Sequence, residues 1–188
     1  MKRFFLYPLL ALLVSINSIC GRILLLYPSN LFFNIQSYLF LVDLFFWCCF
    51  FSVILNNKKD SDKIKALFII TFFVAVYLLF FNKVDKRNLH IGALSAICKT
   101  VFCVFFFYKL FKNLYYQNIL KEPVFWIVTG LIFSSSLLLP FYGLNSYIKA
   151  QFPPLISSNI FSVSNMLIII MHLFFMKAYL CTIQVHKA

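Results

Sequence analysis

Long apolar segments separated by short polar ones are the feature that most constrains this chain. Six such segments occur, at approximately 4–26, 33–55, 65–82, 89–110, 123–142 and 159–182. Each is close to the roughly 20 residues that a helix needs to cross about 30 Å of hydrocarbon. A soluble domain of 188 residues has no core large enough to hide a sequence that is 63% hydrophobic. The pattern therefore predicts an all-α fold, a single polytopic transmembrane helix bundle over 1–188 with about six spans.

Basic residues are unevenly divided between the two ends of such a bundle. Because cytoplasmic loops are rich in Lys and Arg, the excess on one side predicts that both termini lie in the cytoplasm. The N-terminus resembles a secretory signal but has no small-x-small cleavage site, so we expect an uncleaved first span. The richer side receives ten basic residues, Lys2, Arg3, Lys58, Lys59, Lys63, Lys65, Lys109, Lys112, Lys121 and Lys187, and the other receives five, Arg22, Lys83, Lys86, Arg87 and Lys149.

The formal net charge of +12 would suggest a nucleic-acid partner in a soluble protein. Here the basic residues lie mostly between apolar segments, where they set topology and face anionic lipid headgroups. We therefore expect the lipid bilayer, and no nucleic acid, as a partner. All six cysteines lie in or at the ends of apolar segments and form no CxxC motif, so the sequence predicts no metal site and no cofactor.

Two charged residues fall near the middle of predicted spans. Asp43 lies in the second segment and Lys99 in the fourth, each ten residues from its start. At 1.5 Å per residue both lie about 15 Å deep, so an ion pair is geometrically possible. An unpaired charge there costs roughly 2.5–3.5 kcal/mol even on the lenient insertion scale. The pair is open to two interpretations: it fixes the register of the helices, or it forms a ligand, proton or ion site.

Polar residues at helical spacing indicate faces that avoid lipid in every segment except the third, which we expect to face lipid. His172 is interpreted either as an interhelical hydrogen-bonding residue or as a ligand or proton group. Arg22 is either an interfacial anchor or an anion-binding group. The remaining candidates are interpreted mainly as packing or stripe residues: Gln36, Ser95, Thr129, Gly130, Ser136 and Asn165.

No catalytic set stands out in the sequence. There is a single intramembrane carboxylate, and neither HExxH nor GxSxG occurs. Of the three histidines, His90 and His186 lie near the ends of spans, which argues against an intramembrane polyhistidine hydrolase. The sequence therefore does not favour an enzyme.

Three segments carry a resemblance to a known family. They are SYLFLVDLFF (Ser37–Phe46), EPVFWIVTGLIFSSS (Glu122–Ser136) and NMLIIIMHLFFMKAYLCTIQ (Asn165–Gln184). In these the chain resembles a family of uncharacterised bacterial multi-pass proteins, related to the membrane-embedded sensor regions of some histidine kinases. The resemblance implies a sensory role, and a seven-span pattern of which this chain lacks the first helix.

Together these patterns predict a small sensory or ligand-binding membrane module with an interior polar site around Asp43 and Lys99. Lys99 and Arg22 would favour a small anionic ligand. Two alternatives stay open: a transporter of a small solute or proton, and a structural subunit of a membrane complex. A membrane-protein partner or a homo-oligomer is compatible with each of these.

Overall fold

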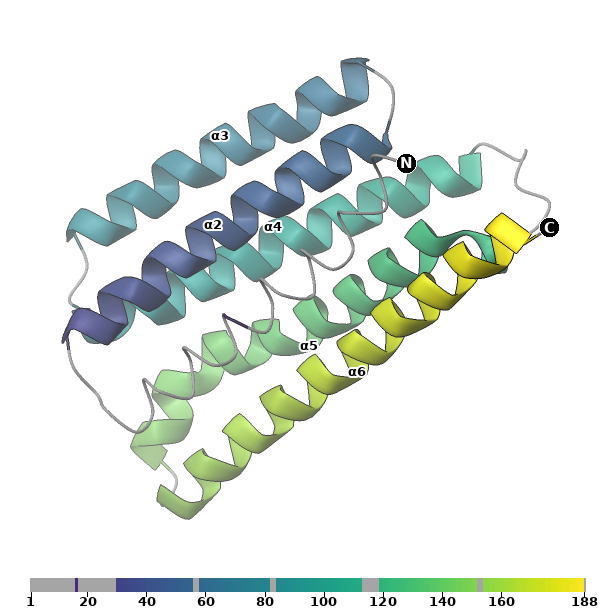
Figure 1. Ribbon diagram of the computed structural model, residues 1–188. Helices are drawn as coiled ribbons and strands as arrows, with labels where there is room; N and C mark the ends of the chain where they lie inside the picture. The colour runs from purple at the N-terminus through teal and green to yellow at the C-terminus, as the bar shows by residue number, and fades with distance from the viewer. Residues whose placement is uncertain are drawn as a thin grey trace.

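The computed structural model is a bundle of long α-helices (Figure 1). It describes residues 16, 30–55, 58–81, 84–112, 119–151 and 154–187. The predicted all-α fold is confirmed for this part of the chain. The predicted span at 4–26 lies outside the described residues, apart from residue 16. In chain order the elements are α2 (Asn30–Ile54), α3 (Lys58–Phe81), α4 (Val84–Lys112), the short 3₁₀ helix η1 (Ile119–Lys121), α5 (Pro123–Gln151) and α6 (Pro154–Lys187).

All five α-helices are long and apolar enough to cross a membrane. Their exposed surfaces are rich in large apolar side chains, which water would not tolerate but lipid does. Together these properties indicate a multi-pass membrane protein. The candidate spans are Ser37–Ile54, Lys58–Phe81, His90–Lys112, Pro123–Gly143 and Asn165–Thr182.

The helices continue beyond the apolar segments of the sequence. The polar stretch before residue 65 was expected to be a loop, but α3 already begins at Lys58. At the other end of the bundle α5 runs through Pro140 to Gln151. Proline is tolerated within membrane helices because neighbouring groups satisfy the freed backbone carbonyl. Pro123 and Pro154 begin α5 and α6, where a missing N–H removes no helical hydrogen bond.

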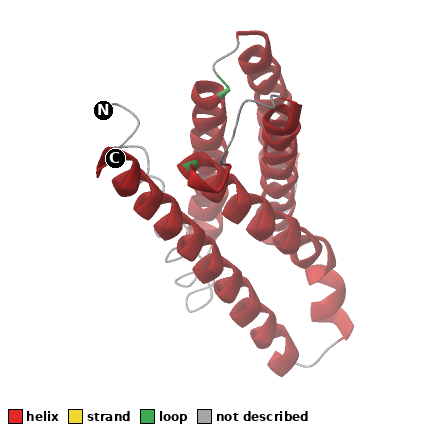
Figure 2. Cartoon of the chain, turned by 90° about the vertical axis from the view of Figure 1, so that its right-hand side faces the viewer, coloured by secondary structure: helices red, strands yellow, loops and turns green. Residues whose placement is uncertain are grey.

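Helix α4 lies at the centre of the arrangement. It packs against α2 and α3 on one side and against α5 on the other, while α6 packs against α5 (Figures 1 and 2). Helices α2 and α4 run in the same direction, and α3 runs in the opposite direction beside both. Residues of α2 and α4 that lie at the same depth therefore face each other, which is the condition the Asp43–Lys99 pair requires.

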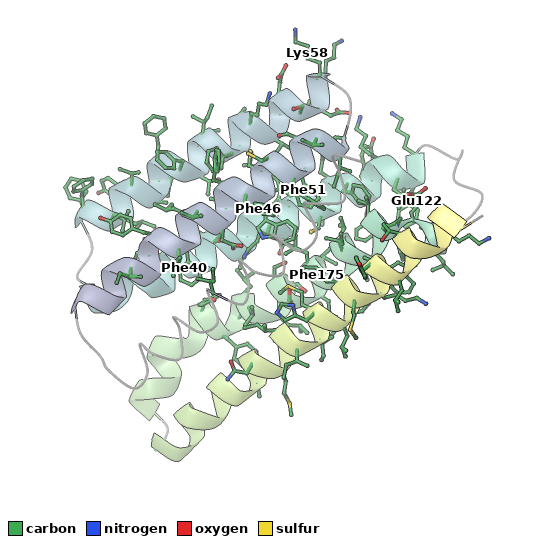
Figure 3. The ribbon with its side chains drawn as sticks, in the orientation of Figure 1. Phe40, Phe46, Phe51, Lys58, Glu122 and Phe175 are labelled. Atoms are coloured by element: carbon green, nitrogen blue, oxygen red, sulfur yellow. The ribbon has the colours of Figure 1, made fainter. Side chains whose placement is uncertain are left out.

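Aromatic side chains fill the space between α2 and α4. Phe51 is fully buried and its ring lies 5.6 Å from that of Phe102 and 6.4 Å from that of Phe106 (Figure 3). Gly130 lets α5 and α6 approach closely, since a Cβ there would lie 2.7 Å from the Cβ of Phe174. Small residues at such crossings are typical of membrane helices, where van der Waals packing holds helices together.

Helix α3 exposes most of its apolar surface, as expected for a lipid-facing helix. Within the predicted segment 65–82, Thr71 is the one polar residue on its buried face among the described residues, and Asp60 lies on the same face before that segment begins. Thr71 donates to the carbonyl of Leu67 at 2.7 Å, and its hydroxyl lies 3.6 Å from the sulfur of Cys98 on α4. A hydroxyl that is satisfied within its own helix can occupy a face that also packs.

Candidate functional site

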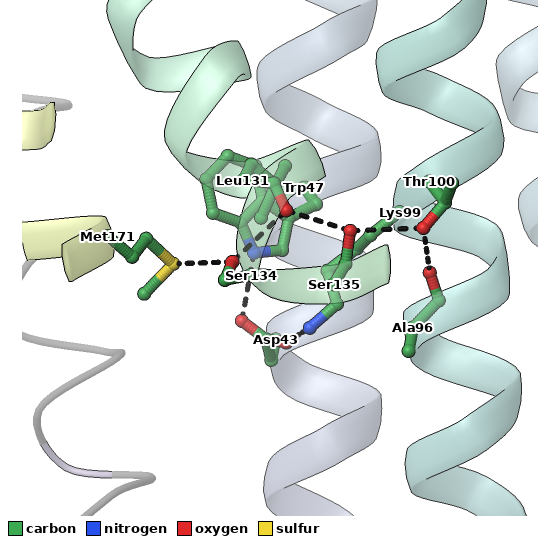
Figure 4. Close-up of polar contacts among 9 residues, drawn as sticks. All are labelled: Asp43, Trp47, Ala96, Lys99, Thr100, Leu131, Ser134, Ser135 and Met171. Atoms are coloured by element: carbon green, nitrogen blue, oxygen red, sulfur yellow. Dashed lines mark hydrogen bonds and ion pairs between the residues drawn. The ribbon is translucent and has the colours of Figure 1, made fainter. Parts of the chain in front are cut away.

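Asp43 of α2 and Lys99 of α4 form an ion pair in the interior of the bundle. The Lys99 ammonium lies 2.8 Å from the Asp43 Oδ2 (Figure 4). The lysine side chain is 17% exposed and the aspartate side chain 9%. Both residues fall within candidate spans, away from their ends. The structure therefore brings together the two charges that the sequence placed at equal depth.

Trp47 completes the surroundings of the carboxylate. Its indole Nε1 donates to the Asp43 Oδ1 at 3.0 Å, one helical turn along α2. Each carboxylate oxygen thus receives one hydrogen bond, from the buried Trp47 of α2 and from the half-buried Lys99 of α4. Bonds to an ionised acceptor are stronger than neutral ones, and more so in a low-dielectric interior. The two contacts fix the position of the Asp43 carboxylate between α2 and α4.

Serines of α5 extend the polar layer across the bundle. Ser135 lies 3.0 Å from the hydroxyl of Thr100 on α4, and Ser134 donates to the sulfur of Met171 on α6 at 3.2 Å (Figure 4). Both serines also donate to the carbonyl of Leu131. One layer of polar contacts therefore connects α4, α5 and α6 beside the Asp43–Lys99 pair. Protein groups, from the same or a neighbouring helix, are the hydrogen-bond partners of these side chains.

Ser95 lies one helical turn before Lys99 on α4. It is 1% exposed, and its hydroxyl has no hydrogen-bond partner among the described residues. The neighbouring level of the bundle is tightly packed, since a Cβ at Gly92 would lie 2.9 Å from the ring of Tyr142 and 3.3 Å from that of Phe40. Ser95 therefore offers an unused donor and acceptor in the seam where α2, α4 and α5 meet.

Other predicted residues lie apart from this cluster. His172 packs edge-on against the ring of Phe175, 6.1 Å between centroids, and makes no hydrogen bond with a described residue. Thr129 donates to the carbonyl of Phe125 in its own helix. Gly130 serves the contact with α6, and Asn165 is half-buried.

The prediction that Ser136 faces the interior is wrong. Its side chain is exposed and bonds to the carbonyl of Phe133 in its own helix at 3.3 Å. Its neighbours Ser134 and Ser135 point inward instead, because a helix turns about 100° per residue. Arg22 and the side chain of Gln36 lie outside the described residues.

A second ion pair was not predicted from the sequence. The Lys109 ammonium of α4 lies 2.8 Å from Asp60 Oδ2 of α3, and Asp60 is 5% exposed. The lysine also lies 5.7 Å from the centroid of the Phe105 ring. Asp60 belongs to a stretch that was expected to be a loop, so no helical face was assigned to it. The apolar residues at helical spacing from Asp60, Ile64 and Ala75, carried the missed signal.

Among the described residues, no group of three His, Cys, Asp or Glu side chains lies close enough to hold a metal ion. The chemistry that these residues offer is recognition, through an ammonium, a carboxylate, an indole N–H and several hydroxyls. No family model matches the chain, and no match was found among the curated proteins or the solved structures. The resemblance to bacterial sensor regions therefore stays a prediction.

Proposed function

We propose that this chain is a sensory or ligand-binding module of a bacterial cytoplasmic membrane, with its binding site at Asp43, Lys99 and Ser95. The observation that carries the proposal is a mid-span ion pair beside a buried hydroxyl with unused hydrogen-bonding capacity. Ionisable groups at such depth are rare in membrane helices and mark functional sites more often than chance.

Stability alone is a weak reason for keeping such a pair. Replacing a buried ion pair by apolar residues of similar size is frequently neutral or stabilising. The Lys99 ammonium has three N–H donors, and Asp43 is its hydrogen-bond acceptor among the described residues. Two further N–H groups and the Ser95 hydroxyl are thus left for another acceptor, and a bound molecule would supply it.

The distribution of basic residues supports the proposed orientation. One end of the bundle holds the beginnings of α3 and α5 and the ends of α2, α4 and α6, and Lys58 extends from it (Figure 3). Near this end the Trp126 Nε1 donates to the Leu120 carbonyl at 2.8 Å, and the Lys177 ammonium lies 5.9 Å from the centroid of the Trp126 ring. Tryptophan and lysine are typical of the interface between membrane and water. By the positive-inside rule we propose that this end faces the cytoplasm, together with the C-terminus and, if 4–26 spans the membrane, the N-terminus.

The proposal is tested by native mass spectrometry of protein released from mild detergent. The purified, delipidated chain is incubated with a total lipid extract of the membranes that produced it, and bound species are read as added mass. The test variant is the double substitution Asp43→Leu/Lys99→Met. The matched control is Asp60→Leu/Lys109→Met, which removes the other ion pair of the same residue types and the same 2.8 Å separation.

We expect the wild type and the control to retain a bound species that the Asp43→Leu/Lys99→Met variant does not retain. Far-UV circular dichroism and gel filtration establish that all three proteins are folded. Identical bound species on all three would mean that the mid-span pair is structural, and the proposal would be wrong.

A further inference from the structure

We infer that the site takes a neutral, lipid-soluble molecule that carries a carbonyl oxygen, rather than an anion. The inference rests on the proposed function and specifies the class of ligand.

The Ser95 hydroxyl differs from most other hydroxyls in the described spans. Those of Thr71, Thr100, Thr129, Ser134, Ser135, Ser136 and Thr182 each donate to a carbonyl three or four residues earlier in their own helix. Such bonds are the usual way in which Ser and Thr are satisfied within helices. Ser95 makes no such bond and is fully buried. Leaving its donor unpaired is unfavourable, so an acceptor from outside the described residues would be stabilised there.

Ser95 and Lys99 provide two hydrogen-bond donors one helical turn apart on α4. Residues four apart on a helix lie on one face, with Cβ atoms about 5–6 Å apart. An oxygen atom held between the hydroxyl and the ammonium would satisfy both. A second described hydroxyl without a partner, that of Ser52, has no charged neighbour at this spacing. The pairing of hydroxyl and ammonium is therefore what distinguishes the Ser95 position.

The charge of the site selects against anions. Asp43 already neutralises Lys99 at 2.8 Å, so the pair has no net charge to offer. An added anion would stand beside the Asp43 carboxylate in a low-dielectric interior, and one negative charge would be left without compensation. A carbonyl oxygen accepts hydrogen bonds without adding charge. The anionic ligand expected from the sequence depended on Arg22, which lies outside the described residues.

The surroundings of the donors suit a molecule that dissolves in the bilayer. One turn from Ser95, the rings of Phe40 and Tyr142 pack edge to face with centroids 6.1 Å apart. The Lys99 side chain is 17% exposed, within the candidate span His90–Lys112. A ligand that reaches Lys99 at this depth arrives from lipid, and the hydrocarbon core admits neutral molecules far more readily than ions.

The experiment uses two photoreactive probes of nearly the same shape. Benzophenone is a neutral aromatic ketone, and 4-benzoylbenzoate adds one carboxylate to it. The full chain is reconstituted in phosphatidylcholine vesicles, irradiated with each probe, and the labelled peptides are mapped by mass spectrometry. Labelling of α3, whose apolar face is exposed, measures the background from probe dissolved in lipid.

We expect benzophenone to label the α4 peptide around Ser95 above the α3 background, and 4-benzoylbenzoate to label it less. Ser95→Ala should reduce the α4 labelling by about fivefold, the effect of one net hydrogen bond. Ser136→Ala is the matched control, because it removes an exposed hydroxyl, and it should leave the labelling unchanged.

Three results would overturn the inference. Preferential labelling of α4 by 4-benzoylbenzoate would show an anion site and leave the proposed function in place. Labelling at the α3 background with both probes, or labelling that Ser95→Ala does not reduce, would show that no carbonyl compound is held there. Failure of the proposed function itself has a different signature, since the Asp43→Leu/Lys99→Met variant would then retain the same bound species as the wild type.

Discussion

Replacing Lys99 by Met removes the only described countercharge of Asp43 while keeping a side chain of similar length. The carboxylate would then stand 9% exposed at mid-span, with Trp47 as its remaining described hydrogen-bond donor at 3.0 Å. Breaking one side of a buried pair costs about 3–5 kcal/mol. Because the indole N–H still stabilises the carboxylate, we expect the lower end of that range for Lys99→Met.

The double substitution Asp43→Leu/Lys99→Met removes the uncompensated charge. Its free energy of unfolding should lie within about 1 kcal/mol of the wild-type value or above it, because apolar residues avoid the desolvation of both ions. The two single substitutions and the double one form a cycle. We expect a coupling energy of at least about 2 kcal/mol, because Lys99→Met alone costs about 3 kcal/mol and the double substitution at most about 1 kcal/mol.

The Asp60–Lys109 pair provides the comparison. Asp60 lies in the first turn of α3, where the positive end of the helix dipole also stabilises a carboxylate, and the Lys109 side chain is 29% exposed. Lys109→Met should therefore lower the free energy of unfolding by only about 1 kcal/mol. We therefore expect Lys99→Met to lower the free energy of unfolding more than Lys109→Met does.

The assay is reversible unfolding in mixed micelles by increasing amounts of dodecyl sulfate, followed by far-UV circular dichroism. The reasoning is refuted if Lys99→Met unfolds within 1 kcal/mol of the wild type, since Asp43 would then find another partner or water. It is refuted equally if the double variant is no more stable than the worse single variant, because the loss would then come from packing.

Three further predictions concern single residues. Gly130→Ala should lower the free energy of unfolding in the same assay by about 1–3 kcal/mol, since its Cβ would lie 2.7 Å from that of Phe174. An unchanged free energy of unfolding would mean that α5 and α6 can move apart without loss of stability. Ser95→Ala should leave the free energy of unfolding unchanged or raise it, because the lost hydroxyl has no hydrogen-bond partner among the described residues. A loss of more than about 1 kcal/mol would mean that the hydroxyl does have a partner. Trp47→Phe removes a donor to the Asp43 carboxylate and should cost about 1.5–3 kcal/mol in thermal or detergent unfolding, whereas a neutral result would assign Trp47 to packing alone.

Much of the candidate site follows from local properties of the chain. Hydropathy along the sequence indicates which residues lie in spans, and the fixed rise of a helix converts position into depth. The sequence therefore predicts that Asp43 and Lys99 lie at the same depth in the membrane. The same reasoning failed for Asp60 and Lys109, because a polar stretch at the end of a span gives no hydropathy signal for a helix.

The direction of each side chain could not be obtained in the same way. Ser134, Ser135 and Ser136 are consecutive and chemically identical, yet the first two face the bundle and the third is exposed. Spacing alone selected Ser136 because it lies seven residues after Thr129. The orientation of α5 depends on its contacts with α4 and α6, which involve residues far apart in the chain.

The sequence by itself determined that this is an all-α chain with spans long enough for a bilayer and with two opposite charges at one depth. Those properties are sums over neighbouring residues or depend on the geometry of a single helix. Only the tertiary structure decided that α2 and α4 run side by side in the same direction and that Trp47 and Lys99 share the Asp43 carboxylate. It alone also decided that Ser95 has no hydrogen-bond partner among the residues that the structure describes. Each of these depends on how helices rotate to pack against one another, and that rotation is settled by all of their contacts together.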